Sequence, residues 1–192
     1  KKHKNYDPDK DISYLCEQSI ENNYIKPEEF NRYQVKRGLR NADGTGVVAG
    51  VSRVCNVHGY VLNEGDRQPV EGELVYRGVD IQDIVKNCEE ENRFGFEEAA
   101  WLLIYGKLPT AHQLDIFNRA LARQRELPDS FIDDTIIKAP TENLMNALQR
   151  STLALYSYDE NPEEATLENT MRQSISLMAK MPILMTAAYQ VK

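Results

Sequence analysis

From Gly78 to its end, the chain consists of one segment after another in which apolar residues recur every three or four positions. This spacing puts apolar side chains on one face of an α-helix. Residues that start or stop helices stand between the segments: Asp80 and Thr110 are typical N-caps, and Gly106 follows the segment that Phe96 opens. Such helices must bury their faces against one another, so we predict a mainly α fold.

Two longer helices are expected near the end of the chain. One spans residues 141–156, with Thr141 as its cap, and the other runs from about residue 163 to residue 192. Pro182 lies inside the second and should kink it or cost a backbone hydrogen bond. No Gly, Asn or Pro ends the helical pattern, so we expect the gene product to continue.

The first 40 residues read as a helical extension, with Asp11 as the cap of one helix and Pro27 in the first turn of another. Between residues 46 and 76 the sequence contains strand-like runs rich in β-branched and aromatic residues, with turn residues at 63–66. We predict a small antiparallel β element there, too small to form the whole core.

Composition excludes several classes of protein. The chain has 23 Lys+Arg against 30 Asp+Glu, a net charge of −7, whereas nucleic-acid binders need a surplus of clustered cations. No apolar stretch approaches the roughly 20 residues of a membrane-spanning helix. The basic start, Lys1–Lys4, is not followed by the apolar region of a secretory signal. We therefore expect a soluble, cytoplasmic protein.

The residues that usually carry chemistry do not form a complete site. Cys16, Cys55 and Cys88 lack metal-site spacing with the three histidines, so we expect reduced thiols and no metal. None of the histidines stands in a nucleophile or base motif. The glycine-rich stretch 43–50 precedes a strand-like run, the reverse of the strand-to-helix order of a dinucleotide loop.

One basic cluster is a candidate for ligand contact. Lys36, Arg37 and Arg40 lie within five residues, next to glycines that let a ligand approach the backbone. Such cations can hold phosphate through charge-assisted hydrogen bonds. A solvated basic loop, or one paired with neighbouring acids, is the alternative that the residues leave open.

Four segments follow one another along the chain: the basic segment 36–41, the Tyr-Arg-Gly turn at 76–81, the helix with its Gly cap and Leu-Pro-Thr restart at 96–110, and the Ala-Lys-x-Pro of 177–182. In this order they resemble the citrate synthase family. One departure is Thr141-Glu142-Asn143, where many members have His-Pro-Met. The N-terminal extension is also longer than in the simplest bacterial forms.

The resemblance implies a fold and a reaction. Residues 41–192 would be the N-terminal part of a multi-helical large domain, truncated before the family's catalytic His and Asp residues. The full-length enzyme would condense acetyl-CoA with oxaloacetate to give citrate and CoA, in the tricarboxylic acid cycle, with acetyl-CoA as substrate and no further cofactor. No catalytic residue carries over to this chain, which we expect to be inactive alone, and Arg40 would contact CoA phosphate.

The resemblance also places the helices at 141–156 and 163–192 at a homodimer interface. The stripe of Met171, Met178 and Met185 suits such a use, because thioethers fill gaps between helices. An ordinary core stripe fits the spacing equally well. Two other functions stay open: a 2-methylcitrate synthase that uses propionyl-CoA, and a helical dimerisation or regulatory module without chemistry.

Overall fold

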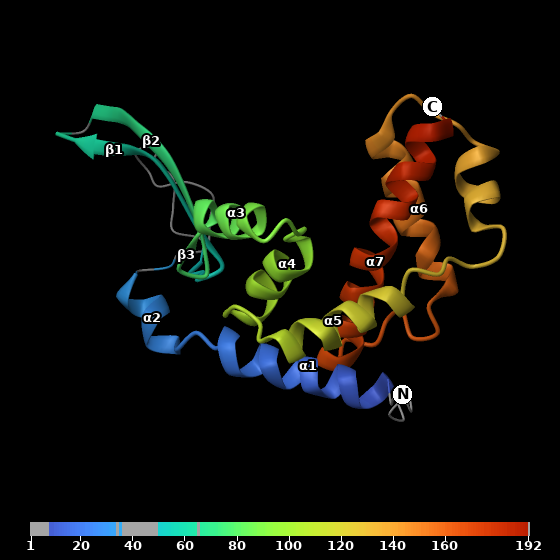
Figure 1. Ribbon diagram of the computed structural model, residues 1–192, viewed down its shortest axis with the longest axis horizontal. Coiled ribbons are helices and arrows are strands. Elements are labelled where there is room, and N and C mark those ends of the chain that lie inside the picture. The colour runs from blue at the N-terminus through green and yellow to red at the C-terminus, as the bar shows by residue number, and fades with distance from the viewer. Residues whose placement is uncertain (1–7, 34, 36–49, 65, 192) are drawn as a thin grey trace. The chain divides into compact units, whose positions relative to one another are not determined.

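The computed structural model describes residues 8–33, 35, 50–64 and 66–191 (Figure 1). The chain divides into two compact units. We call residues 18–114 the hairpin unit, and residues 1–17 together with 115–192 the helical unit. Helices α1 (Pro8–Asn23) and α5 (Ala111–Arg123) contribute residues to both. Most described residues outside the loops are helical, which confirms the predicted mainly α fold.

The hairpin unit holds the sheet. Its strands are β1 (Cys55–Asn63), β2 (Asp66–Tyr76) and the short β3 (Val79–Asp80), antiparallel in the order β1-β2-β3. This confirms the small antiparallel β element. The helices of the unit, besides its share of α1 and α5, are α2 (Pro27–Arg32), α3 (Ile81–Glu90) and α4 (Phe96–Tyr105).

The turn between β2 and β3 is held by an arginine. Arg77 (φ 50°) and Gly78 (φ 86°) both adopt left-handed backbone conformations. The Arg77 guanidinium donates to the Leu103 carbonyl from Nε at 3.0 Å and from Nη2 at 2.7 Å, and Nη2 also donates to Asn23 Oδ1. Burial lowers the pKa of Arg77. The predicted Tyr-Arg-Gly turn is thereby tied to the end of α4 and the end of α1.

Glycine is required where α4 ends. Gly106 has φ 81°, and its N–H donates to the Leu102 carbonyl at 2.9 Å, as expected of a helix C-cap. A Cβ at this position would lie 3.0 Å from Asn22 Cβ and 3.4 Å from the Asn22 carbonyl oxygen. Both the backbone conformation and the close approach of α1 therefore favour a residue without a side chain.

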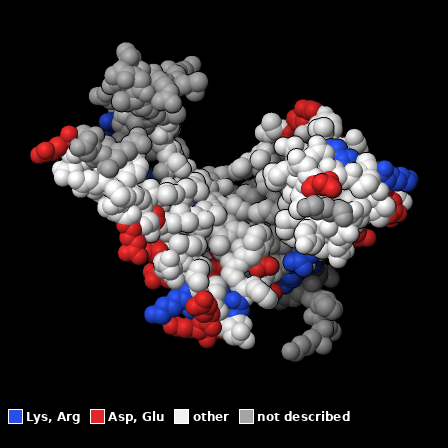
Figure 2. Space-filling view, turned by 90° about the horizontal axis from the view of Figure 1, so that it is seen from above, with Lys and Arg blue, Asp and Glu red and all other residues white. Residues whose placement is uncertain are grey.

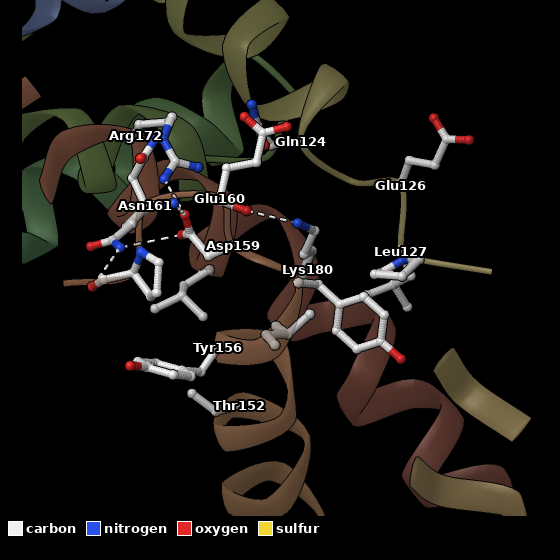
Figure 3. Close-up of a pocket in the computed structure, with 17 residues that line it drawn as sticks. Gln124, Glu126, Leu127, Thr152, Tyr156, Asp159, Glu160, Asn161, Arg172 and Lys180 are labelled. Carbon is white, nitrogen blue, oxygen red and sulfur yellow. Dashed lines mark hydrogen bonds and ion pairs between the residues drawn. The ribbon is translucent and has the colours of Figure 1, made fainter. Parts of the chain in front are cut away.

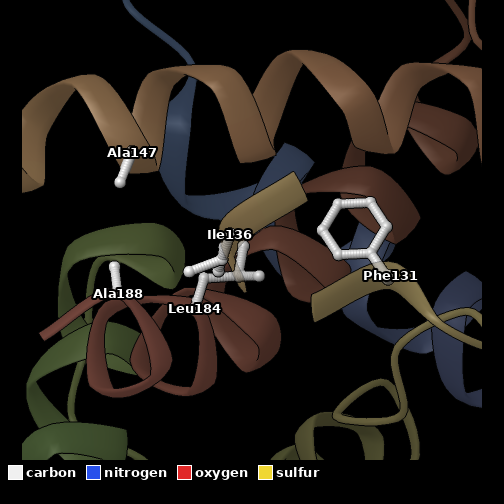
Figure 4. Packing of buried hydrophobic residues seen from close by; sticks show 5 residues of the cluster. All are labelled: Phe131, Ile136, Ala147, Leu184 and Ala188. Atoms are coloured by element: carbon white, nitrogen blue, oxygen red, sulfur yellow. The ribbon is translucent and has the colours of Figure 1, made fainter. Parts of the chain in front are cut away.

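The helical unit surrounds an apolar core. Its further elements are the π-helical η1 (Asp133–Ile137), α6 (Leu144–Leu155), the 3-10 turn η2 (Tyr156–Tyr158) and α7 (Leu167–Val191). Figure 4 shows Ile136 beside Leu184 in this core. The buried cluster consists of Phe131, Ile136, Ala147, Leu184 and Ala188. It joins η1, α6 and α7, so these three elements share one apolar core.

Some helix starts differ from the prediction. Asp11 lies inside α1, which begins at Pro8, so its predicted role as a cap is wrong. The N-cap of α6 is Asn143, whose Oδ1 accepts from the Asn146 N–H at 3.0 Å. Thr141 instead accepts from the Asn143 N–H at 3.2 Å, which supports the turn before the helix. Caps two residues apart share the same local chemistry, and the sequence pattern did not separate them.

The last helix begins at Leu167, four residues later than the predicted start. Asn169 explains the difference: its Nδ2 donates to the Asn161 carbonyl at 2.7 Å and to the Glu164 carbonyl at 2.9 Å. These bonds hold the preceding segment in a loop against the first turn of α7. The helix then continues across Pro182 to Val191. Of the three methionines in the predicted stripe, Met171 is buried, so the core alternative holds at that position.

We expect Gly106→Ala to lower the free energy of unfolding by about 1–3 kcal/mol, because alanine at φ 81° is strained and its Cβ would crowd Asn22. Urea denaturation followed by circular dichroism measures this change. Gly72→Ala is the matched control, since a Cβ there meets nothing within 4 Å, and its effect should stay within about 0.5 kcal/mol. Equal effects of the two substitutions would contradict the assignment.

Candidate functional site

The predicted anion-binding residues lie outside the described part of the chain. These are Lys36, Arg37 and Arg40, together with most of the glycine-rich stretch 43–50. Of the histidines, His58 lies exposed on β1 and His112 lies exposed in the first turn of α5, while His3 is outside the described residues. The two described histidines therefore stand on separate elements.

The three cysteines are free thiols. Cys16 is buried, Cys88 is half-buried and Cys55 is exposed. Burial, and to a lesser degree the charge of Glu168, raises the pKa of the Cys16 thiol, which suits an inert structural cysteine. Within residues 8–33, 35, 50–64 and 66–191, no group of three or more His, Cys, Asp or Glu side chains is placed to hold a metal ion.

A hollow of about 730 Å³ lies in the helical unit (Figure 3). Residues from the loop after α5, from the end of α6 with the loop that follows it, and from α7 line its wall. The lining residues are Gln124, Glu126, Leu127, Pro128, Thr152, Leu155, Tyr156, Tyr158, Asp159, Glu160, Asn161, Pro162, Arg172, Gln173, Ser176, Leu177 and Lys180. The Ala-Lys-x-Pro motif thus contributes its lysine to the hollow.

Asp159 is the centre of a hydrogen-bond network in this hollow. Its Oδ1 accepts from Arg172 Nη2 at 2.5 Å and from the Asn161 N–H at 3.0 Å, and its Oδ2 accepts from Gln173 Nε2 at 3.2 Å. Figure 3 shows Arg172 and Asp159 pointing toward one another. Arg172 also donates to Asn169 Oδ1 from Nε at 3.0 Å and from Nη2 at 2.6 Å. The network ties the loop at 159–161 to α7.

The network sets the protonation state of Asp159. Burial by itself would raise the pKa of this carboxyl group, but the hydrogen bonds from the Asn161 N–H, Arg172 and Gln173, with the charge of Arg172, outweigh it. The net effect is a lowered pKa. A carboxylate held ionised in this way is a poor proton donor near neutral pH.

Among the described residues that line the hollow, Lys180 is the one that carries an amine. Its Nζ donates to Ser176 Oγ at 2.8 Å. Burial lowers the pKa of Lys180, and the charge of Arg172 acts in the same direction, whereas the charge of Asp159 opposes it. The wall also carries the carboxylates of Glu126 and Glu160, so it presents charges of both signs.

The arrangement binds the helical unit together but does not form a set of catalytic groups. Its guanidinium and its central carboxylate are occupied by each other and by neighbouring amides. The pKa values of Asp159 and Lys180 are both lowered, so these two groups do not form an acid and base with opposed shifts. The hydrogen bond from Tyr156 to Glu163 raises the pKa of the Tyr156 hydroxyl, which is thereby paired with that carboxylate. The sequence prediction missed Asp159 and Arg172. The sequence signal that could have indicated them is the Asp159-Glu160-Asn161-Pro162 stretch, whose residues are typical of a turn and precede a long helix.

Charge elsewhere on the surface is mixed. On the face shown in Figure 2, acidic side chains gather at several places with basic ones among them. None of the described helices is long and apolar enough to cross a lipid bilayer.

Comparison with known proteins gives a consistent result. A family model described as "Citrate synthase, C-terminal domain" matches residues 40–192. Citrate synthase of Saccharolobus solfataricus is 33% identical over 121 residues, which cover 63% of this chain and 30% of that protein. Citrate synthase of Haloferax volcanii is 32% identical over 162 residues, covering 80% of this chain and 36% of that protein. The chain thus spans about a third of the length of these curated relatives.

Two further relatives extend the comparison. 2-Methylcitrate synthase 1 of Corynebacterium glutamicum is 26% identical over 151 residues, which cover 79% of this chain and 34% of that protein. The crystal structure of citrate synthase from Pyrobaculum aerophilum superposes with a TM-score of 0.60 at 23% identity, covering 82% of this chain and 40% of that chain. This likeness shows that the fold is shared.

The network around Asp159 predicts a pH-dependent stability. Asp159→Asn should lower the free energy of unfolding at pH 7 by about 1.5–3 kcal/mol, because charge-assisted hydrogen bonds to Arg172 are lost. The folded pKa lies below the unfolded value of about 3.9, so the contribution is complete above that value. It declines as the pH falls below about 3.9 and is gone below the folded pKa.

Urea denaturation of the wild type and of Asp159→Asn, repeated between neutral and acidic pH, measures the difference in their free energies of unfolding. Glu160→Gln is the matched control, because the neighbouring exposed carboxylate lines the same hollow without an ion pair among the described residues. Its effect should stay within about 0.5 kcal/mol at every pH. A wild-type advantage over Asp159→Asn that grows toward acidic pH would have the wrong sign.

Proposed function

The chain belongs to the citrate synthase family, and we propose that the protein to which it contributes condenses acetyl-CoA with oxaloacetate to give citrate and CoA. The match of the family model over residues 40–192 carries this proposal. The citrate synthases of Saccharolobus solfataricus and Haloferax volcanii, at 33% and 32% identity, support the same reaction.

The proposed condensation requires acid, base and hydrogen-bond donor groups that the described residues of this chain do not bring together. A proton must leave the methyl group of a thioester, a weak carbon acid, and the enolate charge that develops must meet preorganised donors. We propose that these groups lie in a further part of the protein, which corresponds to the region of the longer relatives that this chain does not match. The chain's own contribution is then the scaffold of helices on which such residues are mounted.

We propose that Arg40 contacts a phosphate of the CoA substrate. The charge of the segment supports it, since Lys36, Arg37 and Arg40 are a local surplus of cations in a chain of net charge −7. The family match begins at residue 40, next to the proposed boundary between the N-terminal extension and the large domain. A guanidinium can bind phosphate with two parallel hydrogen bonds, which suits an anionic cosubstrate.

A second candidate reaction is the condensation of propionyl-CoA with oxaloacetate. The observation that favours it is the similarity to 2-methylcitrate synthase 1 of Corynebacterium glutamicum over 79% of this chain. The two reactions differ by one methylene in the acyl group, which a pocket distinguishes by about 1–3 kcal/mol.

We propose in addition that the protein is a cytoplasmic homodimer that uses α6 and α7 at its interface. Large apolar side chains exposed on both helices support the choice: Leu153 is 76% exposed and Tyr189 is 67% exposed. Met145 and Met185 are also exposed, at 64% and 51%. Surfaces of this kind are typical of interfaces. Met171 takes no part, because its side chain is buried within the helical unit.

The reaction can be tested by release of CoA thiol. The longer protein, by which we mean this chain together with the region that its relatives have and it does not match, should release CoA from acetyl-CoA only when oxaloacetate is present. The 192-residue chain alone should release none above background. Propionyl-CoA supplied in parallel gives the ratio of kcat/KM values for the two acyl groups. Turnover by the 192-residue chain at the rate of the longer protein would contradict the proposal that the catalytic groups lie outside this chain. No oxaloacetate-dependent release by either would favour a module without chemistry.

The interface can be tested by sedimentation equilibrium. We expect Leu153→Glu to weaken self-association about tenfold or more, because a charge would be buried among apolar side chains. Val57→Glu is the control: Val57 is 74% exposed on β1, outside both helices. Identical association constants for the wild type and Leu153→Glu would place the interface elsewhere.

A further inference from the structure

A second hollow lies in the hairpin unit, between α3 and α4. Its volume is about 510 Å³, and its wall is largely apolar. Among its lining residues, Ile84 is buried, whereas Val85 and Phe96 are 47% and 55% exposed. A Cβ on Gly95 would lie 2.6 Å from Cys88 Sγ, so the backbone passes close to the α3 side chains here.

Phe94 lines this hollow, which we call the groove between α3 and α4, and its side chain is 96% exposed. The turn that carries it is well braced, since the Arg93 N–H donates to the Cys88 carbonyl at 3.0 Å and Arg93 Nη1 donates to Glu98 Oε2 at 2.7 Å. Arg93 also pairs with Glu91. The aromatic ring is therefore presented to solvent by an ordered turn. An almost fully exposed phenylalanine next to an apolar groove is typical of an interaction site.

The surroundings of the groove are acidic. Between Asp80 and Ala99 the chain carries seven acidic and two basic side chains, a net charge of −5. Both basic residues are engaged within the same segment, Lys86 with Glu90 at 3.9 Å and Arg93 with Glu98. Within the described part of the chain, Glu89 and Glu97 make no ion pair, and Glu89 lines the groove. An anionic partner would be repelled here, and a cationic one attracted.

We propose that the groove between α3 and α4 binds an amphipathic, lysine- or arginine-rich peptide segment of a partner protein. Apolar side chains of the segment fill the hollow and cover Phe94, and its cations face Glu89, which lines the hollow. Burial of the apolar surface supplies affinity, while the acidic rim selects the charge of the partner and speeds its encounter. Recognition of a helix in a groove uses this combination of apolar anchors and flanking charges. The proposal does not depend on the reaction proposed above.

Fluorescence anisotropy with labelled synthetic peptides tests the proposal on the 192-residue chain. The probe is an amphipathic helix of about 14 residues built from Leu and Lys. Two matched peptides accompany it, one with Glu in place of each Lys and one with Ser in place of each Leu. We expect the Leu/Lys peptide to bind about tenfold or more tightly than either matched peptide, and to lose affinity as salt is added.

Substitutions then locate the binding. Phe94→Ala should weaken the Leu/Lys peptide about tenfold, without loss of helical content by circular dichroism, because the ring is 96% exposed. Glu89→Gln should weaken binding and reduce its dependence on salt. The matched controls are Tyr24→Ala, an aromatic that is 67% exposed outside the groove, and Asp129→Asn in the helical unit. Both should bind as the wild type does.

Three results would overturn the proposal. Equal binding of the Ser/Lys and Leu/Lys peptides would show attraction by net charge alone. Self-association of the chain that Phe94→Ala abolishes would identify a second copy as the occupant. Binding to the 192-residue chain but not to the longer protein would show that another part of that protein covers the groove.

Discussion

The burial of one face of α7 is the interaction on which the helical unit depends. Leu184 and Ala188, 1% and 4% exposed, pack in one cluster with Ile136 of η1 and Ala147 of α6. A large apolar side chain buried in this way contributes about 1.5–3 kcal/mol. Arg172, Ser176 and Lys180 lie on the same helix, so the polar wall of the hollow follows from the packing of its apolar face. The Asp159 network then fixes the loop before α7.

The hairpin unit depends on a different kind of interaction. The last carbonyl groups of a helix lack partners within that helix. At the end of α4, the Leu103 carbonyl accepts from the Arg77 side chain, and the Ile104 carbonyl accepts from Asn23. These bonds hold the β2–β3 turn and the end of α1 against α4. The start of α3 follows β3 directly, so the same contacts place the groove between α3 and α4.

The proposed function assigns a structural role to the residues of this chain. The matched residues form helices, a short sheet and braced turns, and their charged groups mostly satisfy one another. Condensation of a thioester with a ketone needs an acid, a base and donors for an enolate, all tuned and desolvated. A chain that spans about a third of its curated relatives can provide the framework while other residues provide those groups.

Local chemistry was enough to predict much of the fold. Several predicted features depend only on residues within a few positions of one another, so the sequence alone is enough to recognise them. They are the helical stripes, the cap residues Asp80 and Thr110, the C-cap Gly106 and the hairpin turn. The start of α7 and the Asp159–Arg172 pair depend on residues eight to thirteen positions apart, brought together by the loop. The exposure of Phe94 and the burial of Met171 could not be read from spacing. Only the tertiary structure decides which stretch of an apolar stripe is covered, because that depends on what other elements pack against it.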